Sequence, residues 1–139
     1  MINTVLSIED DKVTQTLNQI HLNTNKFCKN IIVAYNVLEA VDFFKKLDSG
    51  EISMENFPEV IFLDLNMPMM DGWDFFETFK KELAHFEVKT KIFILSSSIN
   101  PADVERAKNE KSIVAFLEKP LNANNLKMVT NLLGLNENI

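Results

Sequence analysis

Five short runs of almost uninterrupted apolar residues recur along the chain, and each is followed by a longer segment with a helical spacing of apolar positions. The runs cover residues 5–8, 31–34, 60–63, 92–95 and 114–117. Apolar runs of this length, without polar alternation, are typical of strands that other elements cover on both faces, as in a parallel sheet. We therefore predict five strands at these positions.

The segments between the runs predict amphipathic helices, because apolar residues recur in them three or four positions apart. Three stripes are clear, and we expect them on the buried sides of their helices. They are Val13, Leu17 and Ile20; Val37, Val41 and Phe44; and Trp73, Phe76, Phe79 and Leu83. A fourth helix is predicted near residues 101–109 on a weaker stripe.

Capping residues support the helix boundaries. Asparagine precedes three predicted helices, at Asn36, Asn100 and Asn122, where its side chain can accept a hydrogen bond from a free backbone N–H. Gly50 and Gly134 follow the ends of two predicted helices, a position that glycine favours. These signals place a helix after the second, fourth and fifth strands.

The alternation of strands and helices predicts an α/β fold with a doubly wound, five-stranded parallel sheet. Right-handed crossovers connect such strands, and a common strand order is 2-1-3-4-5, the flavodoxin-like (βα)5 arrangement. The chain has 139 residues, enough for one compact domain with a core of about 3–134 and a short tail, 135–139. We see no linker or repeat, and we expect no output domain.

Charge and composition exclude several classes of protein. The formal net charge is −6 and no cluster of lysine and arginine is longer than a pair, so we expect no nucleic-acid partner. No apolar run approaches the roughly 20 residues that span a bilayer, and the N-terminus lacks a signal-peptide pattern, so we expect no membrane contact and a cytoplasmic location. The single cysteine, Cys28, cannot form an internal disulfide, and we interpret it as a small buried apolar residue.

The reactive side chains are concentrated where four of the predicted strands end. They are Glu9, Asp10 and Asp11 after the first strand, Asp64 after the third, Ser96, Ser97 and Ser98 after the fourth, and Glu118 and Lys119 after the fifth. The second strand ends in Ala34, Tyr35 and Asn36, without comparable chemistry. In the order 2-1-3-4-5 the second strand is an edge, and the other four are consecutive neighbours about 4.8 Å apart. We therefore expect one pocket at the carboxyl ends of these four strands.

Such a pocket suits phosphoryl transfer to a carboxylate. Crowded carboxylates repel one another unless a cation neutralises them, and hard oxygen ligands favour Mg²⁺. Lys119 and a serine hydroxyl would supply charge and a hydrogen bond to phosphoryl oxygens. Taken singly, each piece also has a structural interpretation: Asp11 as a helix N-cap, the serines as loop hydroxyls, and Lys119 with Pro120 as a helix boundary. Their order on the strands favours the functional interpretation.

In the same segments the chain resembles bacterial two-component response-regulator receiver domains of the stand-alone, chemotaxis-regulator-like kind. Residues 61–72, with their Met-Pro and Asp-Gly pairs, resemble the phosphoacceptor segment of that family. Residues 6–11 resemble its acidic pair, residues 92–97 its hydroxyl-bearing strand and residues 116–120 its lysine motif. The resemblance extends from about residue 5 to residue 133.

The resemblance implies a role for each residue of the expected pocket. Asp64 would be the phosphoacceptor. Glu9, Asp10 and Asp64 would hold Mg²⁺, or Mn²⁺ in its place, together with the backbone carbonyl of Asn66. Lys119, beside a cis bond to Pro120, would contact the phosphoryl oxygens, and so would Ser96.

Further roles follow from the same resemblance. Ser96 and Phe116 would be switch residues that move on activation, while Asn66 and Ser98 would tune the lifetime of the phosphoryl group. The family commonly has Asp, Thr and Tyr where this chain has Glu9, Ser96 and Phe116. We expect serine, with one methyl group fewer than threonine, to loosen the coupling between phosphorylation and the switch. For Phe116, simple packing in the core is the alternative interpretation.

These roles describe a signalling switch rather than an enzyme, because the chemistry is limited to the protein's own phosphorylation and dephosphorylation. The donor would be a sensor histidine kinase or a phosphotransfer protein, or a small acyl phosphate. Phosphorylation would change the surface formed by the fourth predicted helix, the fifth strand and the fifth helix, where a downstream protein effector would bind. We expect a monomer or a weak homodimer.

Three other classes are compatible with parts of the pattern. A receiver that serves only as an interaction module would not respond to Mg²⁺, and the complete set of site residues argues against it. A phosphohydrolase with an aspartyl nucleophile typically has a second aspartate two residues further on, where this chain has Asn66. A flavin-binding domain of similar topology would have a Ser/Thr/Gly-rich phosphate loop after the first strand, and this chain has acidic residues there.

Overall fold

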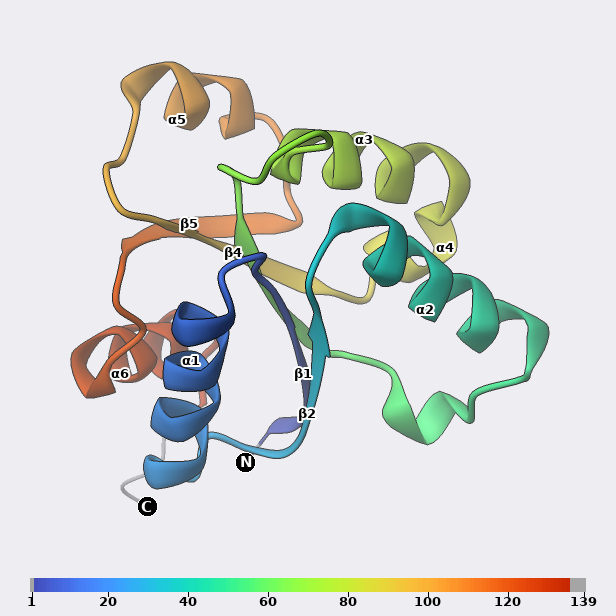
Figure 1. The fold of residues 1–139 in the computed structure, drawn as a ribbon, viewed down its shortest axis with the longest axis horizontal. Helices are drawn as coiled ribbons and strands as arrows, with labels where there is room; N and C mark the ends of the chain where they lie inside the picture. The colour runs from blue at the N-terminus through green and yellow to red at the C-terminus, as the bar shows by residue number, and fades with distance from the viewer. Residues whose placement is uncertain (1, 136–139) are drawn as a thin grey trace.

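Five parallel strands form the sheet of the computed structural model, which describes residues 2–135. The strands are β1 (Ile2–Ile8), β2 (Cys28–Ala34), β3 (Val60–Asp64), β4 (Lys91–Ser96) and β5 (Ile113–Glu118). Their order across the sheet is β2-β1-β3-β4-β5, and neighbouring strands run parallel (Figure 1). The predicted fold class and strand order are confirmed. Apart from Leu135, the predicted tail lies outside the described residues.

Helices cover both faces of this sheet. They are α1 (Lys12–Thr24), α2 (Val37–Ser49), α3 (Gly72–Glu82), α4 (Ala84–Glu87), α5 (Pro101–Ala107) and α6 (Ala123–Leu132), with a 3₁₀ helix, η1 (Met54–Asn56). Helices α1 and α6 lie on one face, and α2 to α5 lie on the other (Figure 1). The one-turn helix α4 was not predicted, since it has no side-chain cap. The fourth and fifth predicted helices are therefore α5 and α6.

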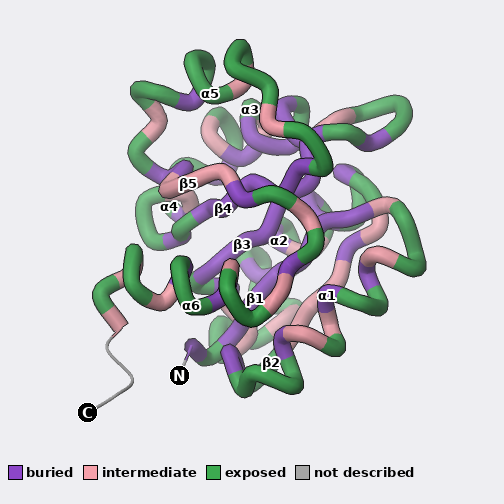
Figure 2. Tube along the Cα trace, turned by 90° about the vertical axis from the view of Figure 1, so that its left-hand side faces the viewer, coloured by how far each residue is buried: buried purple, intermediate pink, exposed green. Residues whose placement is uncertain are grey.

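Aromatic side chains fill the core beneath α2 and α3. The predicted stripes of these two helices are buried, as expected. Phe44 of α2 lies with its ring centroid 4.7 Å from that of Phe79 of α3, and Phe79 in turn stacks on Phe75. A separate cluster, which includes Phe62 and Phe93, fills the opposite face beneath α1 and α6. The strands, covered on both sides, contain the most continuous buried stretches of the chain (Figure 2).

Helix α1 packs on the sheet with a different side from the one that its apolar stripe predicts. Val13, Leu17 and Ile20 are 69%, 44% and 51% exposed, whereas Gln15 and Asn18 are buried beside Leu22. The prediction of the buried face was therefore wrong. The carboxamide of Gln15 donates hydrogen bonds to backbone carbonyls at the strand ends, and only the inward side of the helix can reach them.

Helix caps and the cysteine follow the predictions. The side chains of Asn36, Asn100 and Asn122 each accept a backbone N–H hydrogen bond in the first turn of α2, α5 and α6. Gly50 ends α2 in the left-handed conformation, with φ of 83°. Cys28 is buried, and burial raises the pKa of its thiol to about 11, so that it stays protonated and unreactive. Among residues 2–135, no helix combines the length and apolar content needed to cross a membrane.

Candidate functional site

The carboxyl ends of β1, β3, β4 and β5 bring the predicted site residues to one edge of the sheet. Glu9 follows β1, Asp64 ends β3, Ser96 ends β4 and Lys119 follows β5. The strand ends are also joined directly, because the backbone N–H of Lys119 donates to the carbonyl of Ser96 at 2.8 Å. Strand β2, at the edge of the sheet, contributes no reactive side chain, as expected.

Three carboxylates form a compact cluster at this edge. Glu9, Asp10 and Asp64 each offer an oxygen, and these oxygens lie within 4.8 Å of one another. Glu9 and Asp64 are only 2% and 3% exposed, while Asp10 is half-buried. The donor set is made of hard oxygens on three acids, and this is the chemistry that Mg²⁺ and Mn²⁺ prefer. The residues present therefore fit a divalent cation.

The third acid after β1 has a structural role instead. Asp11 caps α1: its Oδ2 accepts hydrogen bonds from the hydroxyl of Thr14 at 2.7 Å and from its backbone N–H at 2.8 Å. These bonds lower the pKa of Asp11. Its carboxylate is thus engaged at the helix start, and the interpretation of Asp11 as an N-cap is confirmed.

Lys119 forms ion pairs with two of the clustered acids. Its Nζ lies 2.7 Å from Oε1 of Glu9 and 3.4 Å from Oδ2 of Asp64. Burial raises the pKa of Glu9 to about 7; the hydrogen bond from Lys119 opposes this shift, and the charge of Asp64 adds to it. Burial alone would lower the pKa of Lys119, but the two carboxylates offset this and raise it. The pocket therefore holds one positive charge beside Glu9, whose burial disfavours the ionised form of its carboxyl group.

The loop between β3 and α3 holds Asp64 in place. The backbone N–H of Asn66 donates to Oδ1 of Asp64 at 3.0 Å. Gly72 packs directly against the acceptor, because a Cβ at this position would lie 2.7 Å from the carbonyl oxygen of Asp64 and 2.9 Å from Cα of Leu65. Met69, at the tip of the loop, is fully exposed and has a φ of 68°, a left-handed conformation that is uncommon for a residue with a side chain.

The hydroxyl of Ser96 is engaged within its own loop. Its Oγ donates to the carbonyl of Ser98 at 2.7 Å and accepts from the N–H of Ser98 at 3.2 Å. Ser96 is buried, while Ser98 is exposed. The hydroxyl would have to exchange these bonds in order to reach a phosphoryl group on Asp64. The Lys119–Pro120 bond is cis, in agreement with the resemblance.

Phe116 is partly buried on the edge strand β5. It packs against the core cluster beneath α2 to α5. This position agrees with core packing and also with a movable aromatic residue, so both interpretations of Phe116 stay open.

The contacts of two further side chains were missed from the sequence. Gln15 of α1 is buried against the end of β1, where the misassigned face of the helix concealed it. Trp73 of α3 donates its Nε1–H to Oδ1 of Asp103 in α5 at 2.9 Å, and the guanidinium of Arg106 stacks 4.3 Å from the Trp73 ring. A buried tryptophan N–H generally needs an acceptor. The sequence does not indicate which residue supplies that acceptor, because Asp103 is 30 residues away along the chain.

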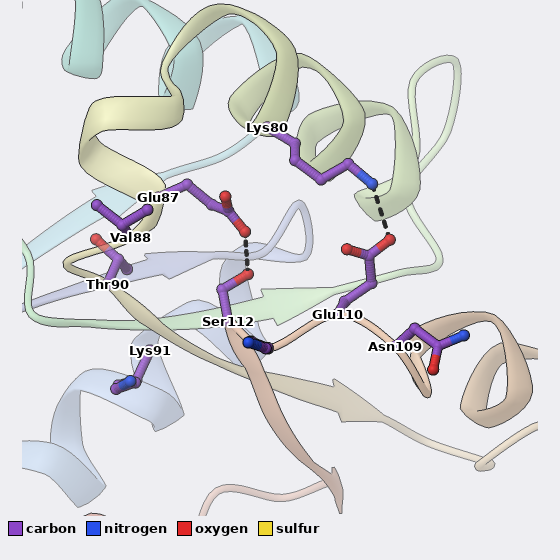
Figure 3. A pocket seen from close by; sticks show the side chains of 9 residues that line it. Lys80, Glu87, Val88, Thr90, Lys91, Asn109, Glu110 and Ser112 are labelled. Carbon is purple, nitrogen blue, oxygen red and sulfur yellow. Dashed lines mark hydrogen bonds and ion pairs between the residues drawn. The ribbon is translucent and has the colours of Figure 1, made fainter.

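A polar pocket of about 450 Å³ lies at the opposite edge of the sheet, near the amino ends of β4 and β5 (Figure 3). Four of its polar groups form two pairs. Lys80 lies 2.8 Å from Glu110, and the hydroxyl of Ser112 donates to Glu87 at 2.6 Å. The pocket contains none of the predicted site residues, so the acidic cluster at the carboxyl edge is the candidate site.

Comparison with known proteins agrees with this fold. Residues 5–131 match the family model of the response regulator receiver domain. The chain belongs to this family of phosphoaccepting signalling domains, and the resemblance inferred from its motifs is confirmed.

Several relatives are similar over most of this chain. Response regulator Rcp1 from Synechocystis sp. is 30% identical over 126 residues, which cover 90% of this chain and 82% of that protein. A Mn²⁺-bound structure of Rcp1 has a TM-score of 0.70 at 27% identity, covering 94% of this chain and 91% of that one. A two-component response regulator from Cytophaga hutchinsonii has a TM-score of 0.84 at 28% identity, covering 96% of this chain and 98% of that one.

A much longer plant protein is similar to this chain over part of its length. Probable histidine kinase 2 from Oryza sativa is 30% identical over 108 residues, which cover 74% of this chain and 10% of the plant protein. The chain thus spans about a tenth of that relative's length. The family match of this chain is to the receiver domain, the part of two-component signalling that accepts a phosphoryl group from a kinase.

Proposed function

We propose that this receiver accepts the phosphoryl group on Asp64 in a reaction that requires Mg²⁺, for which Mn²⁺ can substitute. The observation that carries the proposal is the juxtaposition at one sheet edge of three carboxylate oxygens within 4.8 Å and a lysine 3.4 Å from Asp64. Glu9, Asp10 and Asp64 would hold the cation, with the backbone carbonyl of Asn66 as a further ligand. The Mn²⁺-bound form of Rcp1 supports a divalent cation in this family.

Each residue of the site has a distinct task in the transfer. An oxygen of Asp64 forms a bond to phosphorus while the bond from phosphorus to the imidazole nitrogen of a donor histidine breaks, and the electron pair stays on the nitrogen. Lys119 then exchanges its contact with Glu9 for the phosphoryl oxygens. A bound Mg²⁺ would supply positive charge beside those oxygens.

The switch would begin at Ser96. Its hydroxyl leaves the carbonyl of Ser98 and donates to the phosphoryl group, which draws the loop before α5 inward. Phe116, half-buried on β5, would follow this movement. Asn66, whose N–H donates to Asp64, and Ser98, which is bonded to Ser96, would tune how long the phosphoryl group persists. The protein would thus act on its own acyl phosphate and on no separate substrate.

The partners we propose are a sensor histidine kinase or phosphotransfer protein as donor and a protein effector as receiver of the signal. The effector surface would comprise α5, β5 and α6. Strand β5 is at the edge of the sheet, and Val104 on α5 is 43% exposed, so this surface has apolar groups available to a partner. We propose a monomer or a weak homodimer without nucleic-acid contacts.

Intact mass spectrometry tests the acceptor directly. The protein is incubated with acetyl phosphate, with and without Mg²⁺, beside the Asp64→Asn variant. We expect one phosphoryl adduct that requires Mg²⁺ and is missing from the variant. An adduct that persists in Asp64→Asn would overturn the assignment of Asp64. If no adduct forms, Mg²⁺-dependent binding of beryllofluoride separates rapid hydrolysis from a receiver that does not accept phosphate.

A further inference from the structure

Gln15 is a polar residue buried where an apolar one would be expected. It lies on the inner side of α1, with no exposed surface, and its carboxamide reaches the point where β1 and β2 end. We propose that Gln15 is the positioning residue of the metal site: it fixes the acidic segment after β1 and thereby sets the affinity for the divalent cation. This inference rests on the proposed function, and it assigns a role to a side chain that is not a ligand.

The side chain of Gln15 joins three backbone carbonyls around the acidic segment. Its Nε2 donates to the carbonyls of Ser7 at 3.0 Å, Ala34 at 3.2 Å and Glu9 at 3.4 Å. The carbonyl of Ala34 also accepts the backbone N–H of Glu9 at 3.0 Å. The backbone of Glu9 is therefore held against both β1 and β2 at the point where the chain leaves the sheet.

The backbone of Gln15 holds the other end of the same segment. Its N–H donates to the carbonyl of Asp11 at 2.8 Å, in the first turn of α1. The N–H of Asp11 in turn donates to Oε2 of Glu9 at 3.2 Å, which orients the carboxylate. One residue thus fastens the segment at Glu9 and at Asp11, and Asp10 lies between the two attachments. Partners that orient metal ligands in this way contribute strongly to metal affinity.

The carboxamide of Gln15 uses its donor side and leaves its acceptor side unpaired. Its Oε1 is buried and has no hydrogen-bond partner among the described residues. An unpaired buried acceptor destabilises a fold, and this cost offsets part of the stabilisation that the three hydrogen bonds contribute. What methionine would lack is the donor that reaches Ser7, Ala34 and Glu9. The hydrogen bonds to the acidic segment are therefore the feature that distinguishes glutamine here.

Asn18 offers a matched control on the same face of α1. It is 2% exposed and packs one turn further along the helix. Its Nδ2 makes one long contact of 3.5 Å with Oγ of Ser7, and no hydrogen bond links it to residues 9–11. Replacing Asn18 by leucine removes a buried amide beneath α1 without touching the acidic segment.

The test compares Mn²⁺ binding by wild type, Gln15→Met and Asn18→Leu, measured from the electron paramagnetic resonance signal of free Mn²⁺. We expect Gln15→Met to bind Mn²⁺ about 10-fold more weakly and to stay folded, with a lower unfolding midpoint in urea because the carbonyls of Ser7 and Ala34 lose a donor. We expect Asn18→Leu to bind as wild type does. Wild-type affinity in Gln15→Met, or an equal loss in Asn18→Leu, would overturn the proposal.

A second readout does not depend on the metal. Amide hydrogen exchange followed by NMR in metal-free protein reports the bonds of Glu9 and Asp11 directly. We expect faster exchange at these two amides in Gln15→Met and unchanged exchange in Asn18→Leu. If wild type bound no Mn²⁺, the metal role of the proposed function would fail, and unchanged exchange at Glu9 in Gln15→Met would separately refute the positioning role.

Discussion

The ammonium of Lys119 lies 2.7 Å from Oε1 of Glu9, a shorter distance than the 3.4 Å that separates it from Oδ2 of Asp64. Glutamate is longer than aspartate by one methylene group, and this extra length lets the carboxylate of Glu9 reach the lysine. The lysine and a metal ion consequently compete for the same carboxylate. Four predictions follow from this pair and from the surrounding site.

Removing the lysine should strengthen metal binding. In Lys119→Met the competing charge beside Glu9 is gone, and we expect the affinity for Mg²⁺ to rise roughly 10-fold, equivalent to about 1.4 kcal/mol. Phosphorylation by acetyl phosphate should become slower, because the phosphoryl oxygens lose a positive partner. Isothermal titration calorimetry with Mg²⁺ measures the first effect. Lys111→Met, at the opposite edge of the sheet, is the control; a weaker affinity in Lys119→Met would contradict the competition.

The metal-free protein should lose stability as the pH rises from about 5 to 8. Folding raises the pKa of Glu9 from 4.5 to about 7, so between these values the folded state binds more protons than the unfolded state. The stabilisation is complete below the unfolded pKa and is lost as the pH passes the folded pKa, by an amount on the order of 3 kcal/mol. Urea unfolding in a chelator at several pH values measures it.

Glu9→Gln supplies the comparison for this pH dependence, since its side chain does not titrate. We expect a flatter dependence in that variant. Over the same range the affinity of wild type for Mg²⁺ should increase with pH, because the ionised carboxylate is the ligand. Identical pH slopes in wild type and Glu9→Gln would show that another group titrates.

Adding a methyl group to Gly72 should disturb the acceptor. The new Cβ would meet the backbone of Asp64 and Leu65 at 2.7 and 2.9 Å, so the β3–α3 loop has to shift. We expect Gly72→Ala to lower the free energy of unfolding by about 1–3 kcal/mol and to slow phosphorylation by about 10-fold or more. Mass spectrometry of the adduct over time gives the rate. Gly134→Ala also costs stability, because Gly134 has a φ of 75°, but its Cβ meets no atom within 4 Å and the phosphorylation rate should be unchanged.

The exposed apolar stripe of α1 should affect the rate of phosphoryl transfer from a donor protein but not from a small molecule such as acetyl phosphate. Leu17 and Ile20 are 44% and 51% exposed on the helix that begins beside the acidic segment, so a docked phosphodonor protein would cover them. We expect Leu17→Glu with Ile20→Glu to slow transfer from the cognate phosphohistidine protein by about 10-fold or more. Phosphorylation by acetyl phosphate should be unaffected. The control is Leu38→Glu on α2, and equal transfer rates in all three proteins would exclude α1 as the docking face.

The fold and the acid cluster could be predicted because they depend on residue type and order alone. Continuous apolar runs identify covered strands, and the strand order then brings Glu9, Asp64 and Lys119 to one edge whatever their rotamers are. The partners of these side chains could not be predicted in the same way. That Lys119 contacts Glu9 more closely than Asp64, and that Ser96 bonds to Ser98, depends on distances of a few ångströms that no sequence pattern encodes.

The orientation of α1 illustrates a second limit of sequence patterns. Apolar spacing favours burial of Val13, Leu17 and Ile20, and hydrophobicity alone would turn the helix that way. The backbone carbonyls at the ends of β1 and β2 need donors, and Gln15 supplies them from the other face. Local hydrogen bonding to specific carbonyls therefore outweighed the apolar stripe, which left the stripe free for a partner.

Trp73 is the only tryptophan of the chain, and it bridges α3 and α5 through Asp103 and Arg106. Trp73 directly follows Gly72, which packs on the acceptor Asp64. Its partners are in α5, the helix that comes after the loop containing Ser96 and Ser98. Any inward displacement of that loop must alter the polarity and the stacking around a single chromophore. The ultraviolet emission of Trp73 should therefore report the proposed movement of this loop in real time, without an attached dye.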